Sequence, residues 1–252
     1  MMILVSILSA VLPSLVLLWY FYSRHVNPGP GRVLLTTFVL GILIVAPVAA
    51  LELTAFADFG FITDPFLLGL TKAFWGAAIP EELLKFVVVL FYCFRHQAFG
   101  EPIDGMVYGA VASLGFATME NVLYVTHGGV FLALTRAVTA VPCHAFLGAI
   151  MGYFVGQARF DSRSRGRLFA TGLGLAILLH GLYDFSLLTL RALNVSGRPL
   201  PLMQVLAVSA LSGLFIAVLL IEGFVTVRLL HRLRARQLYV KDRLDKIVKD
   251  QL

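Results

Sequence analysis

The sequence predicts an all-α protein, a polytopic bundle of about seven transmembrane helices. Hydrophobic residues make up 59% of the 252 positions and charged residues only 13%, whereas soluble domains have roughly 45 to 50% and 25%. Long apolar runs recur along the chain, separated by short segments rich in Pro, Gly and charge. At about 20 residues per membrane span, such a chain has no room for a separate soluble domain.

Seven apolar runs are long enough to cross a bilayer as helices. The first is longer than the apolar region of a signal peptide and lacks a basic start and a small-residue cleavage site, so we expect it to remain as a helix. Breakers at 27–31, 128–129 and 197–199 separate successive runs. The predicted spans are 3–22, 33–56, 65–94, 102–125, 130–157, 167–190 and 201–229.

Positive charge is distributed unevenly around these spans. Fifteen of the 20 Lys and Arg residues fall on one side, whereas the opposite loops carry little beyond Arg191 and Arg198. Because cytoplasmic loops retain Lys and Arg, we expect the N-terminus outside and the C-terminus in the cytoplasm. The net charge of +6 thus reflects membrane topology and does not indicate nucleic-acid binding. The fifteen residues are Arg24, Arg32, Arg95, Arg159, Arg163, Arg165, Arg167, Arg228, Arg232, Arg234, Arg236, Lys241, Arg243, Lys246 and Lys249.

The chain divides into a membrane domain, residues 1–230, and a cytoplasmic basic amphipathic tail, residues 231–252. In the tail, apolar residues alternate with basic and acidic ones, a pattern typical of a helix lying on anionic headgroups. The only two cysteines, Cys93 and Cys143, are too few for a disulfide framework.

Ionisable side chains interrupt the third to sixth spans. Each acidic group near the bilayer centre is unfavourable by roughly 2.5 to 3.5 kcal/mol, so such residues indicate function. Counted from the cytoplasmic ends, five of them lie about 12 to 18 residues in, or roughly 18 to 27 Å deep: Glu81, Glu120, His144, His180 and Asp184. The shared depth predicts a single site. Its residues are Glu81, Glu82, Lys85, Glu120, His144, His180 and Asp184.

Two local spacings indicate which of these side chains can pair with each other. Lys85 lies one helical turn after Glu81, so its ammonium can pair with that carboxylate, while Glu82 points about 100° away. One glutamate could be paired and the other free as a base; the spacing does not say which. His180 and Asp184 are also one turn apart, which lets them share a metal or lets the carboxylate orient the imidazole.

Other charged residues have less unusual positions. We expect Glu52 and Arg136 near outer helix ends and Glu222 near a cytoplasmic end, where long side chains reach water. Asp104, near another cytoplasmic end, is a candidate for a supporting role. Loop or interfacial positions are expected for His25, His96, His127 and His231.

Glycines recur at every fourth position in two of the predicted spans. They are Gly105 and Gly109 in one span, and Gly148, Gly152 and Gly156 in the next. Small residues at this spacing let helix backbones approach closely in a membrane. Close packing of the two spans explains them without a catalytic role.

Three motifs together resemble those of the PrsW-type intramembrane proteases, which are related to the CAAX-processing and bacteriocin-immunity membrane endopeptidases. E-E-x-x-K stands at 81–85, F-x-x-x-E-N at 116–121 and H-x-x-x-D at 180–184. His144, followed by Gly148, matches a further histidine between the last two motifs. The resemblance covers roughly residues 71–190.

The resemblance implies a metalloprotease that cleaves membrane-associated proteins; some relatives act on single-pass anti-sigma factors. His144, His180 and one of Glu120 or Asp184 would hold a divalent metal, expected to be Zn²⁺, with a position left for water. Glu81 or Glu82 would be the base that activates the water. Related CAAX enzymes carry His and Asn at the positions of Glu120 and Asp184, so their ligand set does not transfer directly to this chain. A metal-free mechanism, in which a glutamate activates the water, is the alternative.

Two other functions fit a cluster of buried polar residues. A proton- or metal-coupled transporter also places carboxylates and histidines near the midplane, but the sequence shows no inverted repeat and the polar residues gather in the middle spans. A non-catalytic scaffold with the protease fold is the second alternative. The complete set of motif residues argues against it.

Overall fold

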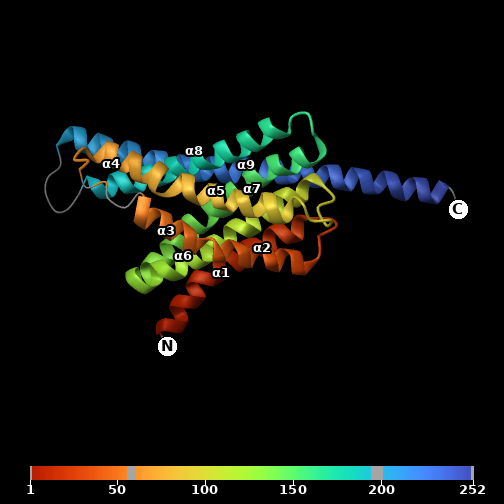
Figure 1. Cartoon of the computed structure of the whole chain (residues 1–252), viewed down its shortest axis with the longest axis horizontal. Coiled ribbons are helices and arrows are strands. Elements are labelled where there is room, and N and C mark those ends of the chain that lie inside the picture. Colours follow the sequence, from red (N-terminus) through yellow and green to blue (C-terminus); the bar gives the residue numbers. More distant parts are fainter. Residues whose placement is uncertain (1, 56–58, 60, 194–200, 251–252) are drawn as a thin grey trace.

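The computed structural model describes residues 2–55, 59, 61–193 and 201–250. Every regular element within these residues is a helix, which confirms the predicted all-α bundle. The long helices run side by side (Figure 1). α6 (Pro102–Val138) lies in the middle, packed against α1 (Met2–Arg24), α2 (Gly31–Leu43) and α7 (Ala140–Phe160).

The observed helices follow the predicted runs. The second run folds as α2 and α3 (Val45–Ala55), and the sixth folds as α8 (Arg165–Ala192). The seventh run forms the first part of α9 (Leu202–Asp250). The predicted end of the second span at 56 and the breaker at 197–199 lie outside the described residues.

Five stretches of the described chain are long and apolar enough to cross a membrane, as judged by length and composition. The third predicted run is not among them; it carries the charges of Lys72, Glu81, Glu82 and Lys85. The first run is also not among them, and part of it lies outside the described side chains. The five are Gly31–Leu53, Pro102–Tyr124, Phe131–Phe160, Arg165–Ala192 and Leu202–Val248. They indicate a membrane protein.

The helical winding of the third run changes around the acidic pair. After α4 (Pro65–Thr71), the π-helical segments η1 (Lys72–Ala78) and η2 (Val89–Cys93) flank α5 (Ile79–Val88). π-Helical turns are rare and frequently lie at functional sites, because they shift the side chains that follow out of the normal register. The irregular winding thus coincides with the segment that carries Glu81 and Glu82.

α6 contains a sharp kink at Gly129, where φ is 69°. This left-handed conformation favours glycine because it lacks a Cβ, and it confirms the predicted breaker at 128–129. The helix resumes directly and runs to Val138, and a second break at Thr139 (φ −122°, ψ −73°) precedes α7. The chain therefore turns back after Gly129 and leads into the fifth predicted span.

Glycines form the contact between α6 and α7. A Cβ built on Gly152 would overlap the carbonyl oxygen of Gly105, and one on Gly109 would overlap that of Gly148. A Cβ on Gly156 would meet the Pro102 carbonyl. The backbones are too close for any side chain here, which confirms the predicted packing role of these glycines.

Gly152→Ala is therefore expected to lower the free energy of unfolding by about 1 to 3 kcal/mol, since the added methyl must push the two backbones apart. The matched control is Gly174→Ala in α8, because no atom lies within 4 Å of a Cβ built there. Alanine favours helix over glycine, so the control should unfold no more easily than the parent. Denaturant titration of both variants in bicelles measures the difference; equal stabilities would contradict the packing role.

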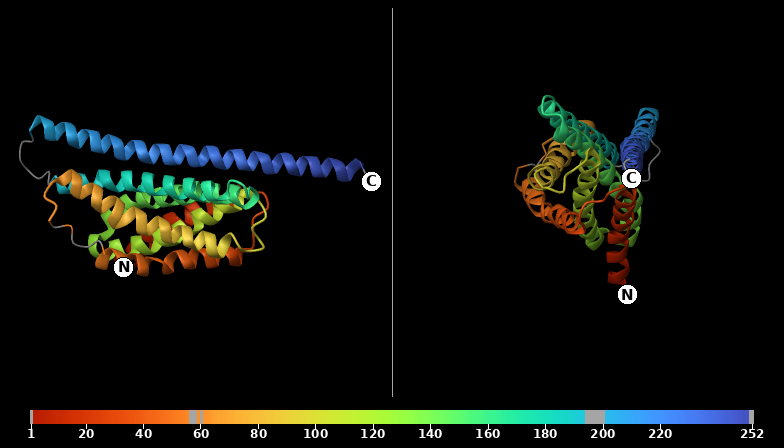
Figure 2. Two further views of the ribbon diagram at one scale, coloured as in Figure 1. Left: turned by 45° about the horizontal axis from the view of Figure 1, so that its top comes forward. Right: turned by 90° about the vertical axis from the view of Figure 1, so that its right-hand side faces the viewer.

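The predicted tail continues the last span without a break. α9 is one helix that runs along the bundle and extends beyond it (Figure 2). At the end of the bundle, Gln237 of α9 donates hydrogen bonds to His25 and Glu101. His25 Nε2 lies 2.8 Å from Asp104 Oδ1, so both residues are buried in a junction that ties α9 to α1 and α6. Asp104 also caps α6, its carboxylate accepting from the Glu101 backbone N–H at 2.7 Å.

Candidate active site

α5 presents its two glutamates and its lysine on a buried face. Glu82 and Lys85 are 0% exposed and Glu81 is 5% exposed. Lys85 Nζ donates to Glu81 Oε2 at 3.0 Å and to Glu82 Oε1 at 2.7 Å. It also lies 3.0 Å from Nδ1 of His144 and 4.2 Å above the ring of Phe116. Both glutamates thus contact the ammonium, whereas the spacing suggested that one would be free.

Two histidines from neighbouring helices face this group. His144 on α7 and His180 on α8 have ring centroids 5.1 Å apart. His180 Nδ1 lies 2.9 Å from Glu82 Oε1, and its Nε2 lies 4.0 Å from Glu81 Oε2. The residues that the sequence placed at one depth on different helices therefore meet in space.

The remaining two predicted site residues each contact Nε2 of one imidazole. Glu120 Oε2 lies 2.9 Å from His144 Nε2. Asp184 Oδ2 lies 3.4 Å from His180 Nε2. A carboxylate on one ring nitrogen fixes the orientation of the ring. In His144 this leaves Nδ1 to face Lys85, whereas both ring nitrogens of His180 contact carboxylates.

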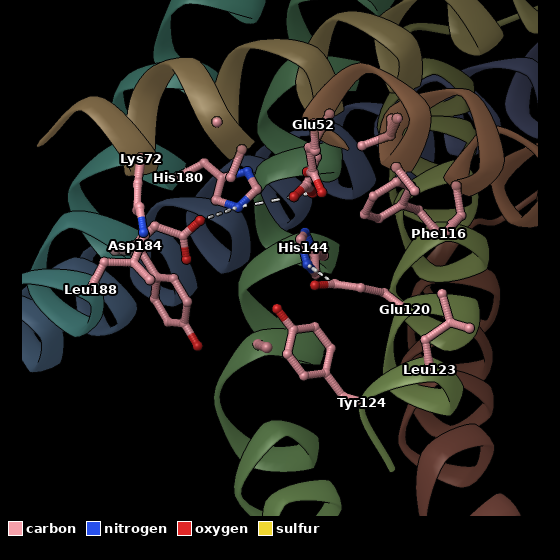
Figure 3. Close-up of a pocket in the computed structure, with 18 of the residues that line it drawn as sticks. Glu52, Lys72, Phe116, Glu120, Leu123, Tyr124, His144, His180, Asp184 and Leu188 are labelled. Carbon is pink, nitrogen blue, oxygen red and sulfur yellow. Dashed lines mark hydrogen bonds and ion pairs between the residues drawn. The ribbon is translucent and has the colours of Figure 1, made fainter. Parts of the chain in front are cut away.

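A cavity of about 330 Å³ opens beside these groups (Figure 3). Glu81 lines it, whereas Glu82 does not. Glu82 instead lies behind, with its Oε2 buried and without a hydrogen-bond partner. The pair is therefore differentiated by access: only Glu81 faces the space that a substrate can enter. The other polar lining residues are Glu52, Lys72, Glu120, Tyr124, Arg136, His144, His180, Tyr183 and Asp184.

Sequence reasoning missed Arg136 and Glu52 as cavity residues and placed them at helix ends. Arg136 Nη2 lies 2.8 Å from Glu120 Oε2, and Glu52 of α3 lines the same cavity. Glu222 of α9, also assigned to a helix end, is fully buried beside Cys143. A signal for Arg136 was present, since it lies inside the fifth predicted span, two turns before His144.

Four of the buried residues can hold a metal ion. Donor atoms of Glu81, Glu82, His144 and His180 all lie within 4.8 Å of one another. Imidazole nitrogens and carboxylate oxygens are ligands that Zn²⁺ takes in proteins, and the buried Oε2 of Glu82 has its lone pairs free. The donor set fits a divalent cation. Glu120 and Asp184, which the sequence proposed as alternative ligands, are not part of this four-residue group.

Lys85 limits how such an ion could bind. Its ammonium already contacts Glu81, Glu82 and His144. Each carboxylate has a second oxygen that can accept, but His144 Nδ1 has a single lone pair. An ion bound to that nitrogen would therefore have to displace the ammonium from it.

Comparison with known proteins gives consistent matches. The sequence profile described as "PrsW family intramembrane metalloprotease" matches residues 29–220. Protease PrsW of Geobacillus kaustophilus (strain HTA426) is 39% identical over 185 residues, which cover 73% of this chain and 80% of the relative. Protease PrsW of Halalkalibacterium halodurans is 38% identical, with 71% and 82% covered. Protease PrsW of Bacillus subtilis (strain 168) is 36% identical, with 73% and 84% covered.

No solved structure matches the chain, so the family is shown by sequence. The matched region contains α2 to α8 and therefore every residue of the buried cluster. The relatives match most of their own length and most of this chain. The chain therefore belongs to the PrsW family of intramembrane proteases.

Proposed function

We propose that this protease cleaves a membrane-associated protein with a water molecule activated by Glu81. The observation that carries the proposal is the position of Glu81. Glu81 lines the cavity, whereas Glu82 is fully buried and does not line it. The His180 imidazole lies 4.0 Å from the Glu81 carboxylate. A general base must have access to the water it deprotonates, and of the two glutamates Glu81 has it.

The reaction needs one proton to move twice. As water attacks the peptide carbonyl, Glu81 takes a proton from it; when the C–N bond breaks, Glu81 returns that proton to the leaving amine. Lys85, which donates to Oε2 of Glu81, fixes the carboxylate so that its other oxygen is directed to the water. Glu82 holds Lys85 and His180 in place through Oε1.

We propose His144, His180 and Glu82 as ligands of a Zn²⁺ ion. When bound, the ion would act as a Lewis acid that polarises the substrate carbonyl. Glu120 and Asp184 would orient the two imidazoles through Nε2 of each ring, at 2.9 and 3.4 Å. This revises the ligand set expected from the sequence, in which Glu120 or Asp184 was the third ligand.

We propose a single-pass membrane protein as substrate, with an anti-sigma factor as the first candidate because the resemblance implies it. The cavity lies among helices that are apolar enough to span a membrane, so a peptide bond inside or at the edge of the bilayer can reach it. Residues 1–230 would form the catalytic membrane domain and residues 231–252 the tail. The N-terminus would lie outside and the C-terminus in the cytoplasm, supported by the uneven placement of Lys and Arg.

The purified protein is expected to contain close to one equivalent of zinc by elemental analysis. His144→Ala and His180→Ala should each lose most of it, because each removes a ligand from the buried group. Chelation should abolish cleavage of a membrane-tethered substrate, and zinc should restore it. The matched control is His231→Ala, since His231 is exposed on α9.

Metal-free protein that still cleaves would remove the zinc assignment and leave catalysis to Glu81 and Lys85. Equal zinc in the parent, His144→Ala and His180→Ala would place any bound ion elsewhere. A transporter would instead show substrate- or proton-driven flux in sealed proteoliposomes, without loss of a substrate protein.

A further inference from the structure

Arg136 is the cation that holds Glu120. Its Nη2 lies 2.8 Å from Glu120 Oε2, and its Nε donates to Asn121 Oδ1 at 3.0 Å. Its guanidinium also lies 4.0 Å from the centre of the Tyr124 ring. Three contacts therefore fix one planar group, and an arginine that is stacked on a ring in this way cannot be replaced by Lys without loss.

The kink in α6 is what makes this contact possible. Arg136 follows Glu120 by 16 residues, and an uninterrupted helix would separate them by about 24 Å. The left-handed Gly129 turns the chain back, so that Arg136 returns to the level of Glu120. The break at Thr139 then allows α7 to begin and to carry His144 to the same carboxylate.

One oxygen connects the arginine with the histidine. Oε2 of Glu120 lies 2.8 Å from Arg136 Nη2 and 2.9 Å from His144 Nε2. A carboxylate at Nε2 keeps the proton on that nitrogen and leaves Nδ1 with its lone pair. His144 Nδ1 is the atom that faces the buried centre, 3.0 Å from Lys85 Nζ. A shift of Glu120 would therefore change both the orientation and the tautomer of His144.

We propose that Arg136 is a positioning residue: it holds Glu120 against His144 and so presents His144 Nδ1 to the catalytic centre. The inference rests on the proposed function, because it assigns His144 a role in that centre. Asn121 and Tyr124 hold the guanidinium, which extends the F-x-x-x-E-N motif by an arginine that the motif does not contain.

The first test measures kinetics on a membrane-tethered substrate. Arg136→Gln is expected to lower kcat by about 10- to 100-fold, the usual effect of disturbing the carboxylate that orients a metal-ligating histidine, with KM changed less than about threefold. Arg136→Lys keeps the charge and should recover part of the loss. Arg191→Gln, at an exposed position on α8, is the matched control and should behave as the parent.

A double-mutant cycle with Glu120→Gln shows the route of the effect. If Arg136 acts through Glu120, the double variant should be no slower than Glu120→Gln alone, because residues that share one contact are not additive. Rate losses that multiply would overturn the inference. Parental kinetics of Arg136→Gln would overturn it as well.

A spectroscopic test does not depend on cleavage. In protein labelled with ¹⁵N-histidine, the ring resonances of His144, assigned with His144→Gln, should show the proton on Nε2 in the parent. Arg136→Gln should populate the other tautomer or broaden these resonances, and Arg136→Lys should restore them in part. Unchanged His144 resonances in Arg136→Gln would refute the positioning role, whereas a tautomer change without proteolysis in the parent would refute only the proposed function.

Discussion

Glu81→Gln is expected to lower kcat by about 1,000-fold while the protein stays folded, which is within the range for loss of a general base. The amide has nearly the shape of the carboxylate and can still accept from Lys85, but it cannot take a proton from water. The proposed water-activating role is tested at Glu81 because Glu81 lines the cavity and Glu82 does not. Cleavage of a membrane-tethered substrate measures the loss, with gel filtration and circular dichroism as checks of folding.

Glu52→Gln is the matched control for this variant. Glu52 lines the same cavity from α3, so the change removes a carboxylate from the same space without touching α5. We expect the kcat of Glu52→Gln to stay within about threefold of the parent, because Glu52 lies outside the hydrogen-bonded cluster around Lys85. Parental cleavage by Glu81→Gln would show that the base lies elsewhere, and an equal loss in Glu52→Gln would assign the effect to cavity charge in general.

The sequence was sufficient to predict the helical bundle because apolar length is a direct physical requirement of the bilayer. It also placed the site residues at one depth, since the axial rise of a helix is fixed. Lys85 was expected to reach Glu81 for the same reason, as the two residues share one helix face, and the structure places them 3.0 Å apart.

What the sequence could not supply was the rotation of each helix about its axis. Depth alone does not say that Glu120 meets His144, or that Glu222 turns inward and becomes fully buried. Arg136 was placed near water because it lies a few residues from a predicted helix end. The kink at Gly129 brings Arg136 back to Glu120. A glycine pair in a sequence predicts that a helix is interrupted, but it does not predict in which direction the chain continues.

The boundary at residue 231 stays a prediction, because a helix can continue past the membrane surface into a tail. A change from apolar to charged composition suggested a separate tail, but no Gly or Pro follows Gly223, so nothing ends the helix at the membrane surface. α9 accordingly continues to Asp250. Composition reports the environment of a segment, whereas helix ends depend on local breakers and caps.

Lys85→Met is expected to lower the free energy of unfolding by about 3 to 5 kcal/mol, because it leaves two buried carboxylates without their cation. Lys85 is fully buried and bonds to both Glu81 and Glu82, so the change removes the donor that the two carboxylates share. Methionine keeps most of the volume, which separates the loss of charge from the loss of packing. Reversible unfolding in bicelles is the measurement.

Lys72→Met is the control for that change, since Lys72 lies on the same run but is exposed, and its unfolding free energy should shift by less than about 0.5 kcal/mol. In Lys85→Met combined with Glu82→Gln, part of the lost stability should return, because one of the two uncompensated carboxylates is then neutral. A Lys85→Met protein as stable as the parent would mean that the two carboxylates do not depend on the ammonium. Another cation would then have to neutralise the buried carboxylates. The zinc content of Lys85→Met would show whether that cation is a bound zinc ion.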